Sequence, residues 1–150
     1  MIVYVDSSVV ARAYLSDEVG HRDAVALMTD PDLVAVTGSW TRIEASGALV
    51  RAARAGRRRG GPDEHDLLAL LDADLGPDGP VTVVGAPQDE VEREALRIVR
   101  AHGLRAMDAW HLAVAKLTLP SLAEPGEDMA FASRDGGQRA VAGLLGFAPR

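Results

Sequence analysis

The pattern of apolar and polar positions along the chain predicts short buried strands that alternate with helices. Brief runs rich in β-branched residues are typical of buried strands, and apolar residues three or four positions apart are typical of amphipathic helices. The predicted strands cover 2–5, 33–37, 81–84 and 129–133, with 147–148 as a further edge strand. The predicted helices cover 7–15, 21–28, 39–55, 63–75, 87–103, 106–119 and 135–146.

Glycine and proline mark the ends of several of these helices. Gly60-Gly61-Pro62 interrupts the pattern, with Pro62 placed in the first turn of the next helix. Gly103 is a typical C-terminal stop, and Pro120 is expected to end the helix that begins at 106. Strands that alternate with helices predict an α/β sandwich with a mostly parallel central sheet flanked by helices. With no internal repeat or linker composition, residues 1–150 are expected to form a single domain.

Composition adds few constraints to this picture. The 150 residues suffice for one hydrophobic core, and the absence of cysteine excludes disulfides and thiolate metal sites. The longest apolar runs are too short to cross a bilayer, and the first residues lack the basic region of a signal peptide. We therefore expect a cytoplasmic protein that does not interact with membranes.

The net charge of −6 argues against a protein that coats nucleic acid generally. However, five of the nine residues in 51–59 are arginine. A local basic segment can still bind nucleic acid, although a solvated helix end is the more common interpretation of such a segment.

Four acidic residues lie at the ends of predicted elements. Asp6 and Asp135 follow the first and fourth predicted strands, and Glu44 and Asp108 lie near the starts of helices. Carboxyl ends of neighbouring parallel strands form the functional crevice of open α/β sheets, so these acids can converge. Taken singly, helix capping is the favoured interpretation for Asp6, Glu44 and Asp135, because Thr41–Glu44 and Asp135–Gln138 have capping-box spacing.

Asp108 fits a capping role least well. It is the only charged residue within 106–115, and Leu112 and Ala115 share its predicted helix face, which is expected to be buried. A buried carboxylate costs several kcal/mol unless it is paired, and a hard divalent cation such as Mg²⁺ or Mn²⁺ would provide the pairing. His111 lies three residues further along and is interpreted as a packing or supporting residue rather than a ligand.

Four segments in this order and spacing resemble a known family. They are "VYVDSSVVARAYL", "RIEASGAL", "RAMDAWHLAVA" and "FASRDGGQRAVAGLLGF", and together they span essentially the whole chain. The set resembles PIN-domain ribonucleases, specifically the VapC-type toxins of bacterial toxin–antitoxin pairs. The resemblance implies a PIN-like three-layer sandwich and metal-dependent hydrolysis of RNA phosphodiester bonds.

Position by position, the resemblance implies that Asp6, Glu44, Asp108 and Asp135 bind Mg²⁺ or Mn²⁺ and carry catalysis. Either Glu44 or Asp135 is expected to orient or deprotonate the attacking water. Ser7, Ser8 and Ser133 match small hydroxyl positions near the site, with serine where the family often has threonine at 133. Positive charge must offset the acidic cleft for RNA, and the candidates are Arg51, Arg54, Arg57, Arg58, Arg59 and, next, Arg42.

The resemblance also implies partners. Toxins of this type form homodimers and are held inactive in hetero-oligomers with a cognate VapB-type antitoxin. An apolar helix surface around Trp40, Leu49, Leu67 and Leu70 could receive the antitoxin peptide, although each of these residues is equally explained as part of the core.

Three rival functions remain to be weighed. A haloacid-dehalogenase-type phosphatase needs a second aspartate where this chain has Ser8, and a phospho-receiver domain needs a lysine at a strand end, whereas Lys116 lies within a helix. The serious alternative is a non-catalytic PIN-fold module that binds RNA or protein.

Overall fold

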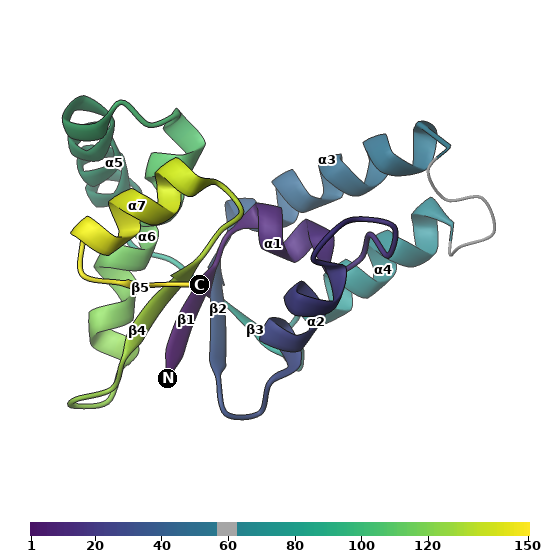
Figure 1. The fold of residues 1–150 in the computed structure, drawn as a ribbon, viewed down its shortest axis with the longest axis horizontal. Helices are drawn as coiled ribbons and strands as arrows, with labels where there is room; N and C mark the ends of the chain where they lie inside the picture. The colour runs from purple at the N-terminus through teal and green to yellow at the C-terminus, as the bar shows by residue number, and fades with distance from the viewer. Residues whose placement is uncertain (57–62) are drawn as a thin grey trace.

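The computed structural model describes residues 1–56 and 63–150. In this part of the chain a sheet of five strands has the order β3-β2-β1-β4-β5, and every neighbouring pair is parallel. The strands are β1 (Ile2–Val5), β2 (Val34–Gly38), β3 (Val81–Val84), β4 (Met129–Ala132) and β5 (Ala148–Pro149). The helices are α1 (Ser7–Arg12), α2 (His21–Thr29), α3 (Trp40–Arg54), α4 (Glu64–Asp74), α5 (Gln88–His102), α6 (Ala106–Leu122) and α7 (Gly136–Leu144) (Figure 1).

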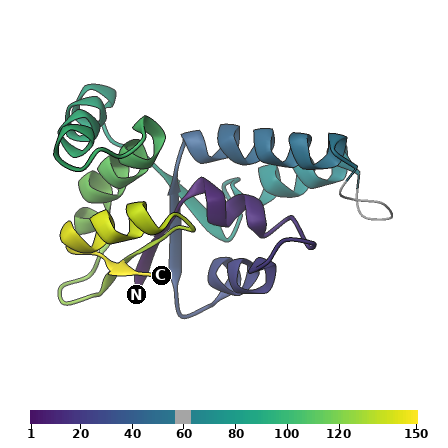
Figure 2. The same cartoon turned by 45° about the horizontal axis from the view of Figure 1, so that its top comes forward.

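The two faces of the sheet are covered by different helices. Alternate residues of β1 point to opposite faces, so Val3 and Val5 join one core and Ile2 and Tyr4 join the other. The first core includes buried residues of α1 to α4, and the second includes buried residues of α5 to α7. Figures 1 and 2 show these two groups of helices on either side of the strands. The predicted α/β three-layer sandwich is confirmed.

Strand order places the ends of β1 and β4 side by side. β1 is central, and its residue Val5 pairs with Ala132 of β4. The next residue, Asp6, donates its backbone N–H to the carbonyl of Ala132 over 3.0 Å. Because both strands run in the same direction, the segments that follow them emerge at one edge of the sheet.

The first helix is shorter than its apolar pattern predicts. The sequence predicts a helix over 7–15, but α1 ends at Arg12. After Ala13, the backbone hydrogen bonds of Tyr14 and Leu15 go to residues three positions back instead of four. The apolar side chains of Tyr14 and Leu15 are nevertheless buried, so the pattern identified core residues correctly and misplaced only the helix end.

Pro120 does not end α6 as predicted. The helix continues to Leu122, and the backbone N–H of Ala123 closes it on the carbonyl of Leu119 over 2.9 Å. A proline here removes a single backbone hydrogen bond near the helix end, where the loss is small. Despite its length of 17 residues and its apolar composition, α6 cannot cross a bilayer, and the same holds for the other helices of the described ranges.

An ion cluster joins α5 to α6. The Glu94 carboxylate accepts hydrogen bonds from Arg97 Nη2 over 2.5 Å and from Lys116 Nζ over 2.8 Å. The hydrogen bonds from Arg97 and Lys116, together with the charges of both residues, lower the pKa of Glu94 to about 2 although partial burial opposes the change. Lys116 lies on α6, so the cluster stabilises the packing of the two helices.

The lowered pKa of Glu94 predicts a defined loss of stability in acid. Its folded-state pKa lies below the usual value of 4.5, so the contribution is present above pH 4.5 and is lost as the pH falls towards about 2. We expect the Tm of Glu94→Gln to lie below that of wild type at pH 7, with a difference that shrinks below pH 4.5. Glu92→Gln, on the same helix with only the neutral Gln88 as partner, is the control. A difference that stays constant from pH 7 to pH 2.5 would contradict the assignment.

Candidate active site

Asp6 is fixed at the junction of β1 and α1. It caps α1, and its Oδ1 accepts hydrogen bonds from Ser8 N over 3.0 Å, Ser8 Oγ over 2.6 Å and Val9 N over 3.1 Å. The residue is only 4% exposed. Burial raises the pKa of its carboxyl, and the bonds from Ser8 and the neighbouring groups offset this only in part. The predicted capping role is confirmed, and all three of these bonds go to one carboxylate oxygen, Oδ1.

Asp108 lies in the first turn of α6 and is half-buried. Burial is the main cause that raises the pKa of its carboxyl, followed by the negative charges of Asp135 and Asp6, and Arg105 and His111 offset these only in part. Among the described residues, none donates a hydrogen bond to this carboxylate. Asp108 is therefore a carboxylate held near other carboxylates, and the charge of Arg105, the nearest cation in the local sequence, compensates for them only in part.

Ser133, Asp135 and Gln138 form a connected group beside Asp108. Ser133 Oγ donates to Gln138 Oε1 over 2.5 Å, and Gln138 Nε2 donates to the backbone carbonyl of Asp108 over 3.1 Å. Asp135 is exposed and caps α7 by accepting from the backbone N–H of Gln138 over 2.8 Å. Gln138 is fully buried, and it joins the end of β4 to the start of α6.

Glu44 is held from the opposite side by a buried histidine. His111 Nε2 lies 2.6 Å from Glu44 Oε2, and His111 Nδ1 lies 2.9 Å from the Tyr4 hydroxyl oxygen. Burial acts to raise the pKa of the Glu44 carboxyl, but the hydrogen bond from His111, its charge and the Ser7 hydroxyl outweigh it, so the pKa lies below its usual value. Since an ionised carboxylate can only accept, we assign the Nε2 proton to His111.

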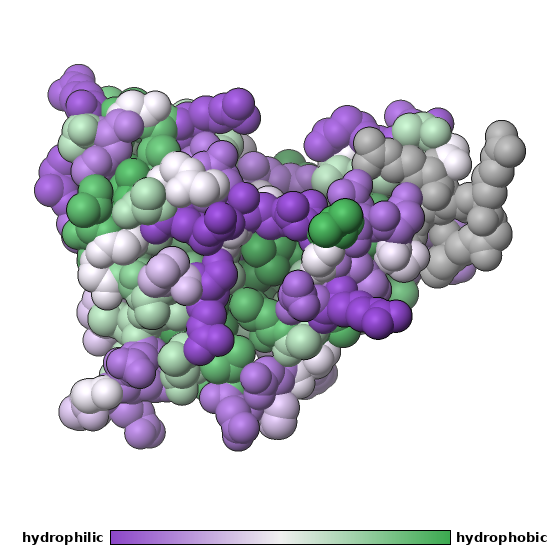
Figure 3. Space-filling view, in the orientation of Figure 1, coloured by the Kyte–Doolittle hydropathy of each residue, from purple (hydrophilic) through white to green (hydrophobic). Residues whose placement is uncertain are grey.

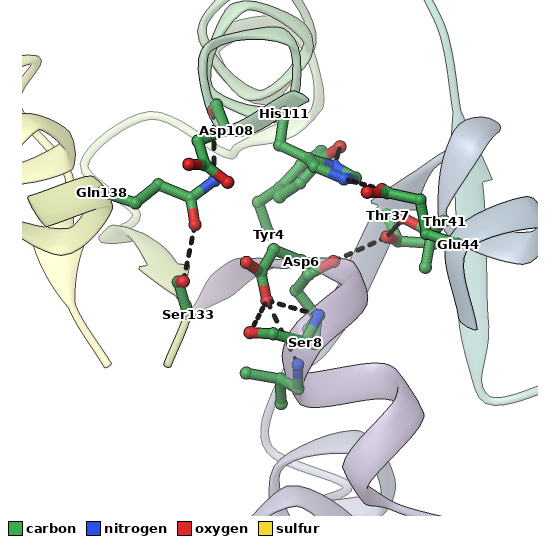
Figure 4. A network of polar contacts seen from close by, with 12 residues as sticks. Tyr4, Asp6, Ser8, Thr37, Thr41, Glu44, Asp108, His111, Ser133 and Gln138 are labelled. Carbon is green, nitrogen blue, oxygen red and sulfur yellow. Dashed lines mark hydrogen bonds and ion pairs between the residues drawn. The ribbon is translucent and has the colours of Figure 1, made fainter. Parts of the chain in front are cut away.

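The predicted capping box at Thr41–Glu44 is wrong. The residue before α3 is Ser39, which makes no capping bond with its side chain, and Thr41 lies inside the helix. The Thr41 hydroxyl instead pairs with that of Thr37 over 2.7 Å, and Thr37 Oγ1 donates to the carbonyl of Val5 over 2.6 Å. Glu44 is consequently free of any capping role and turns towards His111 (Figure 4).

The four predicted acids are brought to one region but not into one tight cluster. Figure 4 shows Asp6 between Asp108 on one side and Glu44 on the other. The negative charges of Asp135 and Asp6 both raise the pKa of Asp108, whereas Glu44 pairs with His111. In residues 1–56 and 63–150, no three acidic, histidine or cysteine side chains are grouped closely enough to hold a metal ion. The prediction that all four acids bind metal stays a prediction.

The donor set nonetheless fits a hard divalent cation. Mg²⁺ and Mn²⁺ prefer carboxylate oxygens, keep several waters and are commonly bound through only one or two protein carboxylates. In the part of the chain described, the Asp108 carboxylate accepts no hydrogen bond, and the negative charge of Asp6 raises the pKa of Asp108. A cation between them would remove this repulsion.

The predicted RNA-contacting arginines differ in their surroundings. Arg42 donates to the carbonyl of Leu75 over 2.8 Å and lies 3.4 Å from Asp72. Arg54 lies 3.7 Å from Glu64, so Arg42 and Arg54 both connect α3 to acids on α4. Arg51 is exposed. Arg57, Arg58 and Arg59, like the break at Gly60-Gly61-Pro62, lie outside the described residues.

The expected apolar docking surface is only partly on the surface. Leu49 and Leu67 are buried in the first core and cannot contact a partner, because α3 and α4 pack against each other through these side chains. Trp40 and Leu70 are exposed at 42% and 51%. Of the two interpretations left open by the sequence, the core interpretation therefore holds for Leu49 and Leu67.

Three residues of the site were not predicted as functional. Tyr4 and Gln138 are buried, and they lie near the acids because the fold brings distant parts of the sequence together. Thr37 connects the end of β2 to β1 through a hydrogen bond to the Val5 carbonyl. His111 was interpreted as a supporting residue, and its contacts with Tyr4 and Glu44 confirm that interpretation. The spacing of Asp135 and Gln138 was a usable signal for Gln138, although it indicated only a cap.

Gly38 provides the space in which this network packs. A Cβ at Gly38 would lie 2.6 Å from the Tyr4 hydroxyl oxygen and 2.7 Å from the ring of Trp110. We expect Gly38→Ala to lower the free energy of unfolding by about 1–3 kcal/mol, measured by urea denaturation. Gly143→Ala in α7, where a Cβ meets nothing within 4 Å, is the control and should be neutral or slightly stabilising. Equal unfolding midpoints for Gly38→Ala and wild type would refute the packing argument.

Comparison with known proteins agrees with this architecture. The family model of the PIN domain matches residues 3–143. The chain belongs to the PIN-domain family, and its fold is a nuclease-type fold. No curated protein matches the chain.

Proposed function

We propose that this protein is a metal-dependent endoribonuclease and acts as the VapC-type toxin of a toxin–antitoxin pair. The observation that carries the proposal is the pair formed by buried Asp6 and half-buried Asp108: burial raises the pKa of both carboxyl groups, and the negative charge of Asp6 adds to the effect at Asp108. A fold that served only for binding would have no need to keep these two charges together, because burying unpaired carboxylates is costly.

Asp6 and Asp108 would hold Mg²⁺ or Mn²⁺, with Asp135 and Glu44 at the edge of the site. When bound, such an ion lowers the pKa of a water molecule and neutralises charge on the scissile phosphate. Ser8 and Val9 fix the position of the Asp6 carboxylate through Oδ1. Gln138 fixes the first turn of α6, and so the position of Asp108, through its bond to the Asp108 carbonyl.

Glu44 is the better candidate for the residue that orients the attacking water and accepts its proton. His111 and Ser7 keep the pKa of Glu44 below its usual value, so it is ionised at neutral pH. Its carboxylate is also half-buried and held by a buried residue, which fixes its direction. Asp135 is exposed and occupied as the cap of α7, which makes it better suited to the outer coordination of the site.

RNA is the proposed substrate, and a cognate VapB-type antitoxin and a second copy of this chain are the proposed partners. Arg51 is the described residue of the basic segment with no acid paired to it, and Arg57, Arg58 and Arg59 continue that segment in the sequence. For the antitoxin peptide, the exposed side chains of Trp40, Ile43 and Leu70 provide apolar contact area on α3 and α4.

The test is cleavage of total cellular RNA by the purified, partner-free protein in Mn²⁺ or Mg²⁺, with EDTA as the control. We expect discrete fragments that EDTA abolishes, together with a rise in Tm on addition of Mn²⁺ because the ion binds only the folded state. Absence of both cleavage and the Tm shift in folded protein would overturn the proposal. A Tm shift without cleavage of any RNA would instead favour the non-catalytic binding module.

A further inference from the structure

A hollow lies between α1, α2 and the segment that joins β4 to α7. It has a volume of about 360 Å³ and is lined by apolar residues together with the arginines Arg12, Arg134, Arg139 and Arg150. Figure 3 shows hydrophilic side chains bordering apolar ones in the middle of this face, close to the C-terminus marked in Figure 1. The hollow is called the arginine pocket below.

Two guanidinium groups converge at one wall of the arginine pocket. Arg12 Nη1 and Arg134 Nη1 both donate to the carbonyl of Val19, the latter over 2.8 Å. Both groups also lie against Gly20, where a Cβ would be 3.1 Å from Arg134 Nη1 and 3.4 Å from Arg12 Nη1. A single carbonyl oxygen carries only a partial charge, so it cannot neutralise two adjacent cations.

The positive charge of the arginine pocket is poorly compensated. Arg12 has an acidic partner in Glu18 at 3.5 Å, yet its buried Nε has no hydrogen-bond partner among the described residues. Within the described ranges, Arg134, Arg139 and Arg150 form no ion pair. Arg139 donates to the carbonyl of Ser133 over 2.6 Å, and Arg150 has only the weak acceptor Met1 Sδ at 3.4 Å.

We propose that the arginine pocket binds the phosphate group of a nucleoside monophosphate. Guanidinium groups pair with phosphate through parallel, charge-assisted hydrogen bonds, and a terminal phosphate offers three oxygens to several arginines at once. Asp23 is the only acid among the described residues that line the pocket, so positive charge is in excess there. Burying an anion there would remove the repulsion between Arg12 and Arg134.

The remaining lining suits the nucleoside part of such a ligand. Val9, Ala24, Leu27 and Ala132 provide an apolar floor, and a volume of about 360 Å³ is at the lower end of the range for small-molecule sites. A single inorganic ion would leave most of this space unused. The size of the pocket therefore favours a mononucleotide, which is either free in solution or the phosphorylated end of an RNA strand.

The arginine pocket is connected to the acidic site but separate from it. The backbone N–H of Arg134 donates to Ser8 Oγ over 3.1 Å, and Ser8 Oγ in turn donates to Asp6 over 2.6 Å. Ser133 belongs to both sites. It lines the arginine pocket, and its hydroxyl donates a hydrogen bond to Gln138 beside the acidic site. The inference does not depend on RNA cleavage, because phosphate binding by the arginines requires neither the carboxylates nor a metal ion.

The test is isothermal titration of the full chain with uridine monophosphate and with uridine, at low salt and in EDTA. Without metal the acidic site repels phosphate, so its contribution is removed. We expect uridine monophosphate to bind at one site, and uridine to bind at least about tenfold more weakly. Arg139→Gln and Arg150→Gln should each weaken binding by about tenfold, the change expected for loss of one charge-assisted contact.

Arg139→Gln also removes the hydrogen bond to the Ser133 carbonyl, so a second variant is needed. Arg150 is exposed, and Arg150→Gln should not disturb folding. Arg22 lies close by on α2 but does not line the pocket, so Arg22→Gln removes the same charge and should change affinity less than twofold.

A short RNA with a 5′-phosphate, compared with its 5′-hydroxyl form, distinguishes a free mononucleotide from the phosphorylated end of an RNA strand as the ligand. Binding of the phosphorylated RNA but not of the mononucleotide would assign the site to strand ends. If folded protein bound neither ligand, or if both variants bound as wild type does, the proposal would be overturned.

Discussion

Asp108→Asn should abolish RNA cleavage and at the same time leave the metal-free protein as stable as wild type or more stable. The carboxylate accepts no hydrogen bond in the part of the chain described, so the substitution takes an acceptor away from no other group, and the half-buried amide can still reach water. Burial and the charges of Asp135 and Asp6 raise the pKa of Asp108, which means that holding its charged carboxylate in the folded protein costs free energy. Removing that charge removes the repulsion.

Asp108→Asn is informative because it should lower activity without lowering stability. We expect kcat/KM to fall by at least about a hundredfold, because a neutral amide binds a hard cation poorly. The Tm without metal should be unchanged or higher by up to about 3 °C, since loss of the favourable position at the start of α6 offsets part of the gain. The rise in Tm that Mn²⁺ causes in wild type should disappear.

Asp78→Asn, in an exposed loop, is the matched control and should keep both cleavage and the Mn²⁺ effect. If Asp108→Asn lowered the Tm of the metal-free protein by several degrees, the carboxylate would be a structural group after all. If it kept both cleavage and the Mn²⁺ effect, the site would have to be placed elsewhere.

The elements of the fold were predictable because they depend on local composition. The runs at 2–5 and 81–84 are short and β-branched, and the structure has strands with these bounds. The errors fall at the ends of elements, where one or two backbone hydrogen bonds decide the outcome. The strand predicted at 33–37 covers Val34–Gly38, the one at 129–133 ends at Ala132, and the one at 147–148 covers Ala148–Pro149. Nothing in the local sequence indicates that the backbone tightens after Ala13 or that α6 tolerates Pro120 near its end.

The candidate site was predictable in its acids, in the serines beside them and in the supporting position of His111. The positions of the acids at element ends follow from strand and helix boundaries, and parallel pairing of β1 with β4 brings two of these ends together. The contacts that Tyr4 and Gln138 make around these acids could not be predicted from local sequence. Tyr4 meets His111 across 107 positions and Gln138 meets Asp108 across 30, so these contacts exist only in the folded chain. Apolar patterning indicates that such residues are buried but gives no information about their partners.

The largest loss of stability is expected from His111→Ala, because His111 joins both halves of the network. It is 2% exposed, and its ring lies 5.8 Å from that of Tyr4 and 5.3 Å from that of Trp110, centroid to centroid. Alanine would leave a cavity between these rings, and it would remove the partner of both the buried Tyr4 hydroxyl and the Glu44 carboxylate. Each of these changes destabilises a folded protein by itself.

We expect His111→Ala to lower the free energy of unfolding by about 3 kcal/mol, which corresponds to a Tm lower by about 6–12 °C in a chain of this size. Tyr4→Phe keeps the ring and should cost about 1–2 kcal/mol, because it removes only the hydroxyl that meets His111 Nδ1. His65→Ala, at an exposed position on α4, should change stability by less than about 0.5 kcal/mol.

Combining Tyr4→Phe with His111→Ala then measures the interaction directly. Since the two side chains are in contact, the loss in the double variant should be smaller than the sum of the two single losses by about 1 kcal/mol. Strict additivity would mean that Tyr4 and His111 contribute independently. His111 would then be a core residue that happens to lie beside Glu44, and the assignment of His111 as the residue that positions Glu44 would lose its physical basis.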